Sequence, residues 1–308
     1  MKKKIFKSPM DALLILLAIV IILLSINNNL RLKRENNKII PYGQAVKVGK
    51  KEMRVSISGK GDKTLVLMSG YLTASPVIDF LPLTKELEKN YKVVVIEPLG
   101  YGLSDDTRKK RKVENLSKEM HTALESLNIK KYTLVGHSIA GVYALDYIDR
   151  YQNEVEGFIG IDSSVPSLEG SDNNREKALR FAARTGLYRA ASHADEDILR
   201  YPPVDEKLKK QFKYISMRDM GARARKSEGK LMEKNFEKVE NIQYKKDFPV
   251  LFILSKETIK EYSNWIEVHE DMIKDLKKGK LVVYDGPHYL HHTKAKEITS
   301  EIKDFITY

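Results

Sequence analysis

One long apolar run stands out near the N-terminus, after a short basic start. Residues 10–26 are apolar apart from Asp11 and Ser25, and these 17 positions lie at the lower limit for crossing roughly 30 Å of hydrocarbon. A cleaved signal peptide would end in small residues of the Ala-x-Ala kind, whereas this run ends in Ser-Ile-Asn-Asn-Asn-Leu. We therefore predict an uncleaved membrane anchor, rather than a cleaved signal or a buried or interfacial helix, followed by a polar linker at residues 27–41.

From residue 42 onward, short β-rich runs alternate with longer amphipathic stretches. Two runs separated by Gly-Lys-Lys predict an opening hairpin at 45–48 and 53–58. Buried strands are then predicted at 63–70, 91–97, 132–136, 155–162, 249–254 and 280–286. Helices are predicted at 76–89, at 113–127, after the strand at 132–136 to about residue 151, at 258–276, and at the C-terminus.

This alternation predicts an α/β fold with a mostly parallel central sheet and helices on both faces. The strand signals stop between residues 167 and 247, where the chain is charged and helix-like. We expect this stretch to form a helical cap inserted after the sixth strand. The expected organisation is an anchor and linker at 1–41, a core at 42–166 and 248–308, and a cap at 167–247.

Composition removes several classes of function. The chain has no cysteine, which excludes disulfides, thiolate metal sites and cysteine nucleophiles. Its net charge is +12, but residues 1–40 carry eight basic and two acidic side chains, so much of the excess flanks the apolar run. No nucleic-acid motif, metal-ligand spacing or phosphate-cradling glycine loop is visible. We expect no nucleic-acid partner, no metal and no cofactor.

The stretch LVGHSIAGVY, residues 134–143, carries the strongest chemical signal. An apolar strand ends there and a helix begins, with Ser138 flanked two residues away by the small Gly136 and Ala140. Small neighbours allow a strained turn that exposes the serine hydroxyl, although a simple structural turn would use the same residues.

Three further loops give this signal its context. LMSGYLTASP follows the third strand, EPLGYGLSD follows the fourth with Glu97 in place of the usual Asp, and GPHYLHH follows the last. With these four loops in order, the body of the chain, 42–308, resembles the α/β-hydrolase superfamily, in the serine-nucleophile branch with a helical cap.

The resemblance implies a Ser–acid–His triad with Ser138 as nucleophile and His288 as the base that takes its proton. The neighbouring His291 and His292 are expected to be structural or solvent-facing. The side chain of His137, beside the nucleophile, is expected to point away from the site.

The acid of the triad stays open between two main candidates. The family most often carries it in the turn after the seventh strand, where this chain has Thr258 and the nearest carboxylate is Glu257. The other candidate is Asp162 at the end of the sixth strand, where some lipase-like members carry their acid. Glu261 is a third alternative, as is the lack of any acid.

The resemblance also implies an oxyanion hole made by the backbone N–H groups of Tyr71 and Ile139. Ser69 stands where the family usually has a histidine, but the donor belongs to the main chain. Trp265, the only tryptophan, is expected to serve packing. The cap offers apolar residues for a pocket or for packing against the core: Leu179, Phe181, Ala182, Leu187 and Tyr188.

These expectations together describe a membrane-anchored serine hydrolase that cleaves a carboxylic ester of a lipid or another small acyl compound. A peptidase or thioesterase would use the same residues, and a non-catalytic binding or sensing module would keep the same fold. Basic residues flank the apolar run on both sides, and the positive-inside rule favours a single pass in the cell membrane with the catalytic domain extracytoplasmic.

Overall fold

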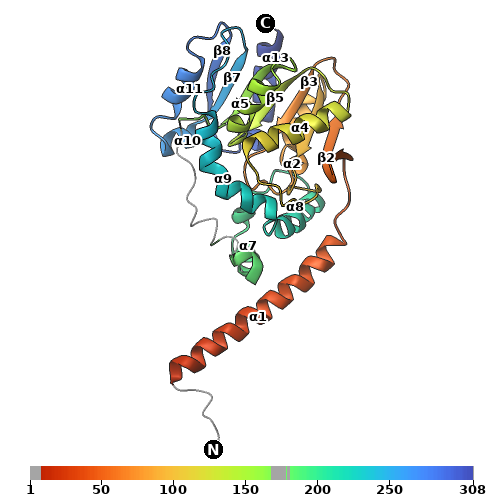
Figure 1. The fold of residues 1–308 in the computed structure, drawn as a ribbon, viewed down its shortest axis with the longest axis vertical. Helices are drawn as coiled ribbons and strands as arrows, with labels where there is room; N and C mark the ends of the chain where they lie inside the picture. The colour runs from red at the N-terminus through yellow and green to blue at the C-terminus, as the bar shows by residue number, and fades with distance from the viewer. Residues whose placement is uncertain (1–7, 168–177, 179–180, 308) are drawn as a thin grey trace, which may run out of the picture.

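The central element of the computed structural model is an eight-stranded sheet with the strand order β1-β2-β4-β3-β5-β6-β7-β8. The structure describes residues 8–167, 178 and 181–307 (Figure 1). β1 and β4 both pair antiparallel with β2, and all other neighbouring strands are parallel, which confirms the mostly parallel sheet and the opening hairpin. The strands are β1 (Gln44–Val48), β2 (Lys51–Ser58), β3 (Thr64–Met68), β4 (Lys92–Glu97), β5 (Tyr132–His137), β6 (Val155–Ile161), β7 (Val250–Ser255) and β8 (Gly279–Tyr284).

Helices cover both faces of this sheet (Figure 1). In β3, Leu65 and Leu67 pack in one cluster with side chains of α3 and α13, whereas Val66 packs in a second cluster with side chains of α4 and α5. Because both faces are buried, the strands read as continuous apolar runs. The core helices are α2 (Pro76–Asp79), α3 (Leu81–Leu87), α4 (Val113–Ser126), α5 (Ala140–Arg150), α10 (Lys256–Glu261), α11 (Trp265–Ile273), α12 (Leu290–Thr293) and α13 (Ala295–Thr307).

Two predicted helices are each divided in two. The stretch 76–89 forms α2 and α3 with Phe80 between them, because Pro82 has no N–H to donate to an i−4 carbonyl. The stretch 258–276 forms α10 and α11, with residues 262–264 between them.

The part of 167–247 that the structure describes is helical and contains no strand. Its elements are α7 (Leu187–Ala194), the short 3₁₀ helix η1 (Glu196–Leu199), α8 (Glu206–Asp219) and α9 (Arg223–Val239). In Figure 1 they lie at the end of the body that faces the N-terminal helix. Leu179, proposed as a pocket residue, lies outside the described residues.

The N-terminal helix α1 (Pro9–Asn36) is 28 residues long and projects from the body (Figure 1). By length and composition it is long and apolar enough to cross a membrane. We expected a polar linker from residue 27, but the helix continues to Asn36. It does so because Asn28 and Glu35 hydrogen bond to the cap, which gives this polar half a tertiary partner.

Candidate active site

Ser138 occupies the sharp turn between β5 and α5. Its backbone lies in the left-handed region with φ of 57°, a conformation that costs about 1–3 kcal/mol for a residue with a side chain. The N–H of Ser164 holds the turn by donating to the Ser138 carbonyl at 2.8 Å. A methyl group at Gly70 would lie 2.9 Å from the Ser138 Cβ, so only glycine lets the loop after β3 approach this closely. This is the strained strand-turn-helix geometry that the sequence predicts.

Asp162 and His288 meet at the carboxyl end of the sheet. Asp162 follows β6, is fully buried, and also has a positive φ, of 44°. Its Oδ2 lies 2.6 Å from Nδ1 of His288, in the loop after β8. A carboxylate accepts, so Nδ1 carries the proton and Nε2 keeps its lone pair. His288 therefore has the tautomer that a general base requires.

Three further groups donate to the Asp162 carboxylate. The Thr258 hydroxyl lies 2.5 Å from Oδ2, while the Ser255 N–H and the Trp265 indole N–H lie 2.9 and 3.1 Å from Oδ1. Thr258 stands where the family usually has its acid, and here it supports the carboxylate of the neighbouring strand instead. Trp265 was expected only to pack, and its hydrogen bond to Asp162 adds a positioning contact.

Glu257 and Glu261, the other two acid candidates, are both exposed on α10. The Glu257 backbone N–H donates to the Ser255 hydroxyl at 3.2 Å, which places this residue in the first turn of the helix. Among the residues that the structure describes, no hydrogen bond joins either carboxylate to His288. The structure therefore brings Asp162, and neither glutamate, to the histidine.

The remaining histidines near the site form a buried group behind His288. His137 donates from Nε2 to the His288 carbonyl at 3.1 Å, and burial lowers its pKa, which keeps it neutral. His291 and His292 contact the two oxygens of Asp79 at 2.8 and 3.0 Å. Burial lowers the pKa of His291 to about 4. The structural role expected for this pair fits these contacts, and the solvent-facing alternative was wrong.

Asp79, His291 and His292 are also the one group of metal-ligand types that lies close together in the described part of the chain, with ligand atoms within 4.8 Å of one another. Hydrogen bonds from both rings to both carboxylate oxygens already account for this arrangement. We therefore assign the cluster to holding α12 against α2.

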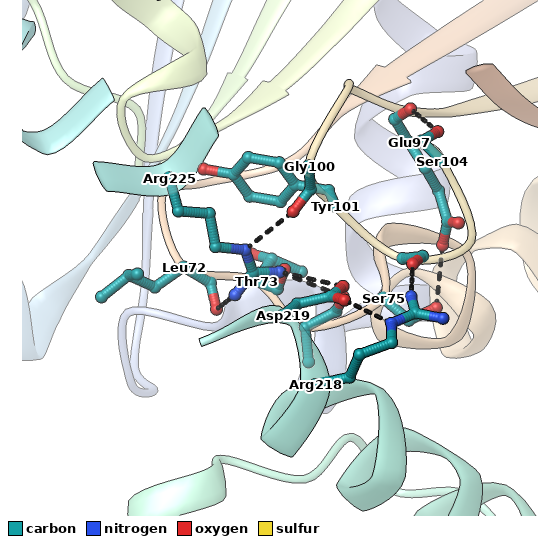
Figure 2. A network of polar contacts seen from close by, with 12 residues as sticks. Leu72, Thr73, Ser75, Glu97, Gly100, Tyr101, Ser104, Arg218, Asp219 and Arg225 are labelled. Carbon is teal, nitrogen blue, oxygen red and sulfur yellow. Dashed lines mark hydrogen bonds and ion pairs between the residues drawn. The ribbon is translucent and has the colours of Figure 1, made fainter. Parts of the chain in front are cut away.

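A cap residue, Arg225 of α9, holds the loop that carries the expected oxyanion donor (Figure 2). Its guanidinium is buried and donates to the carbonyls of Thr73 at 2.7 Å, Ala74 at 3.2 Å and Gly100 at 3.2 Å. In return, the Tyr71 hydroxyl donates to the Arg225 carbonyl at 3.2 Å. Sequence reasoning missed this residue because one arginine in a charged helical stretch carries no distinguishing signal.

The loop after β3 needs this support because the side chain at position 69 does not hold it in place. Ser69, which replaces the usual histidine, is buried, and its hydroxyl has no hydrogen-bond partner among the described residues. The arginine from the cap thus supplies an anchor that the sequence at position 69 does not provide.

The loop after β4 is held by Glu97 (Figure 2). Its carboxylate is buried and accepts from the Leu103 N–H at 2.6 Å, the Tyr42 hydroxyl at 2.7 Å and the Ser75 hydroxyl at 2.9 Å. Burial raises the pKa of Glu97 to about 7, although these donors oppose the shift. Glu97 thus ties the loop after β4 to the loop after β3.

We call the loop after β3, residues 69–75, the oxyanion loop, after the donor expected in it. An apolar cavity lies next to this loop, but Ser138 and His288 are not among the residues that line the cavity. It borders Ser69 and is walled mostly by the sheet and by α4 and α5. It therefore lies beside the candidate nucleophile and not at it. Its apolar walls include Met53, Met68, Ile96, Leu116, Met120 and Tyr143.

Comparisons with known proteins agree with this fold. An uncharacterized protein of Bacillus subtilis (strain 168), YbdG, is 26% identical over 259 residues, which cover 81% of this chain and 80% of that protein. The bromoperoxidase of Bacillus anthracis superposes with a TM-score of 0.67 at 18% identity, covering 87% of this chain and 100% of that one. The enol-lactonase of Burkholderia xenovorans LB400 superposes with a TM-score of 0.61 at 17% identity, covering 86% of this chain and 100% of that one. The model of the α/β hydrolase fold matches residues 63–295, and the chain belongs to this family.

Proposed function

We propose that this protein is a serine hydrolase that cleaves a carboxylic ester through an acyl-enzyme, with Ser138 as nucleophile, His288 as general base and Asp162 as the acid. The observation that carries the proposal is the 2.6 Å contact between the buried Asp162 carboxylate and His288 Nδ1. It leaves Nε2 unprotonated and able to act as a base toward Ser138, which lies in a strained turn after β5. We thus assign the role of the triad acid to Asp162, whereas the sequence alone left both Asp162 and Glu257 as candidates.

In the acylation step, His288 Nε2 takes the proton of the Ser138 hydroxyl as its oxygen attacks the ester carbonyl. The backbone N–H groups of Tyr71 and Ile139 stabilise the oxyanion that forms, each by roughly 3–4 kcal/mol. The tetrahedral intermediate then expels the alcohol, which receives the proton from His288. Asp162 stabilises the imidazolium that exists between these two transfers.

In deacylation, His288 takes a proton from a water molecule, and the resulting hydroxide attacks the acyl-enzyme carbonyl. The same two N–H groups donate hydrogen bonds to the second oxyanion. Collapse releases the carboxylic acid and returns the proton to Ser138, so the enzyme is regenerated without a cofactor or a metal.

The family also includes proteins with other chemistry, and the nucleophile narrows the choice. A serine oxygen forms an acyl-enzyme from an ester, a thioester or an amide, and an ester is less demanding than an amide because an alcohol leaves more readily than an amine. The four donors on Asp162 favour catalysis over a pure binding role, because a binding module has no need of a buried carboxylate held against a histidine.

The test is hydrolysis of p-nitrophenyl acetate, butyrate and octanoate by the full chain in detergent micelles. We expect turnover that Ser138→Ala abolishes, while Ser126→Ala, at an exposed serine on α4, leaves it unchanged. Equal turnover by the wild type and Ser138→Ala would refute the proposed nucleophile.

A further inference from the structure

The polar half of α1 is joined firmly to the cap. Arg189 of α7 is buried, and its two terminal nitrogens contact the two oxygens of Glu35 at 2.7 Å each. Its Nε donates to the Asn28 side chain at 3.0 Å, and the Asn28 amide donates to the Ala183 carbonyl at 3.0 Å. Bidentate arginine–carboxylate pairs fix orientation as well as distance. The helix and this part of the cap therefore move as one unit.

The cap meets α1 where the apolar run ends. Gly186 has a φ of 83°, and a methyl group there would lie 3.1 Å from the Asn28 Cβ and 3.4 Å from the Leu24 carbonyl oxygen. Leu24 and Ile26 are the last apolar residues of the run, and both are exposed. At about 1.5 Å of rise per residue, the cap begins within one or two helical turns of that point. A bilayer crossed by α1 would have its boundary at the level of α7.

The cap segment at this level exposes apolar side chains. We call Phe181, Leu187 and Ile198 the interfacial patch, since these side chains are 55%, 41% and 38% exposed. Arg184 and Arg200, also exposed, lie in the same segment. An apolar surface flanked by arginines suits the headgroup region of a membrane, where apolar groups enter the acyl boundary and cations meet phosphates. Other large exposed apolar residues outside α1 are scattered: Ile40, Ile57, Tyr262 and Val283.

The same segment reaches the candidate active site. Tyr188 and Leu199 pack in one cluster with Leu32 of α1 and Leu72 of the oxyanion loop. The Arg200 guanidinium lies 5.5 Å from the centre of the Tyr289 ring, next to His288 in the chain. The segment thus lies between α1 on one side and the loops after β3 and β8 on the other.

We propose that the interfacial patch lies in the headgroup region of the bilayer that α1 crosses, and that the substrate is an acyl ester resident in that bilayer. The ester enters the site from the lipid phase, past α7 and η1. The substrate assignment rests on the proposed function, whereas the position of the patch does not.

The position is tested in vesicles of phosphatidylcholine and phosphatidylglycerol that contain the full chain. The chain has no cysteine, so Leu187→Cys or Ile198→Cys provides one attachment site for an environment-sensitive dye. The exposed Val283 on β8, changed to Cys, is the matched control. We expect lipid-borne spin labels to quench the dye at positions 187 and 198 at least threefold more than at 283. Equal quenching at all three positions, or a protein that does not co-float with vesicles, would overturn the proposal.

The substrate class is tested with two fluorophosphonate probes, one short and water-soluble and one with a long alkyl chain confined to the vesicles. For Leu187→Glu combined with Ile198→Glu, we expect unchanged labelling by the soluble probe and about tenfold slower labelling by the vesicle-bound probe. Val283→Glu should change neither rate. An equal loss with both probes, or no loss with either, would overturn the entry route. A wild type that reacts with neither probe would overturn the proposed function and the substrate class, while the quenching result would stand.

Discussion

At the scale of single residues, the distinctive feature is where the acid lies. Thr258 occupies the position after β7 that usually carries it, and a carboxylate from the end of β6 fills the space beside the histidine. The hydroxyl of Thr258, 2.5 Å from Asp162, then becomes a donor to the acid. Buried carboxylates need such donors, because an unpaired buried charge is costly. The histidine still contacts one buried carboxylate, but this carboxylate follows β6 and not β7.

The first prediction concerns this acid. Asp162→Asn should lower kcat/KM for ester hydrolysis by roughly 10³–10⁴-fold, because an amide at this place fixes the wrong histidine tautomer. Glu257→Gln is the matched control and should stay within twofold of the wild type. Circular dichroism would check that both variants fold. A large loss in Glu257→Gln with none in Asp162→Asn would reverse the assignment.

At this scale, the sequence singles out a residue only where its type and its loop leave few alternatives. Ser138 and His288 stand in loops whose order along the chain marks them. Asp162 and Glu257 both follow strands that end at the same edge of the sheet, so spacing alone left them open. Only the side-chain contacts distinguish them, since one is buried against the histidine and the other lies exposed on α10.

At the scale of elements, α9 of the cap also holds two loops near the proposed catalytic residues. Arg225 satisfies main-chain carbonyls of two loops at once and stacks on Tyr101, with its guanidinium 4.4 Å from the ring centre (Figure 2). These carbonyls have no strand or helix to pair with. The position of the oxyanion loop therefore depends on an element that is remote in sequence.

The second prediction follows from this dependence. Arg225→Ala should lower kcat about 10–100-fold with little change in KM, because a loop displaced by a fraction of an ångström weakens only the stabilisation of the transition state. Arg225→Lys should recover part of kcat, and Lys230→Ala, at an exposed position of the same helix, should match the wild type. A loss of thermal stability with an unchanged kcat would show that Arg225 only supports the fold.

The third prediction concerns Glu97, whose pKa is raised to about 7 in the folded chain. The folded state then binds a proton more tightly than the unfolded state, so this group stabilises the fold at low pH. That contribution, up to about 3 kcal/mol, is lost as pH rises from about 4.5 through 7. Denaturant titrations from pH 4.5 to 8 should show this fall in the wild type and a flatter profile in Glu97→Gln. Parallel profiles would contradict it.

Elements were predictable wherever one face or both faces are apolar. The strands of the sheet follow from continuous apolar runs. The apolar periodicity did not predict that the helices would be interrupted near Phe80 and at residues 262–264. The sequence carries no signal for the extension of α1 to Asn36, because the partner of Glu35 is a buried arginine more than 150 residues away. Tertiary contacts decide such cases over local propensity.

At the scale of the whole molecule, half of the basic excess lies at the same end of the chain as the apolar run. The cap helices α7 and α8 lie between α1 and the sheet (Figure 1). If α1 crosses a bilayer as proposed, the basic residues on either side of its apolar run would be attracted to anionic headgroups.

The most direct test of the central claim is covalent labelling of the full chain by a soluble fluorophosphonate, mapped by mass spectrometry. The account predicts one adduct on Ser138, absent in Ser138→Ala and formed at least 100-fold more slowly in Asp162→Asn. A folded protein that gains no adduct, or gains it on another serine, would contradict an activated Ser138.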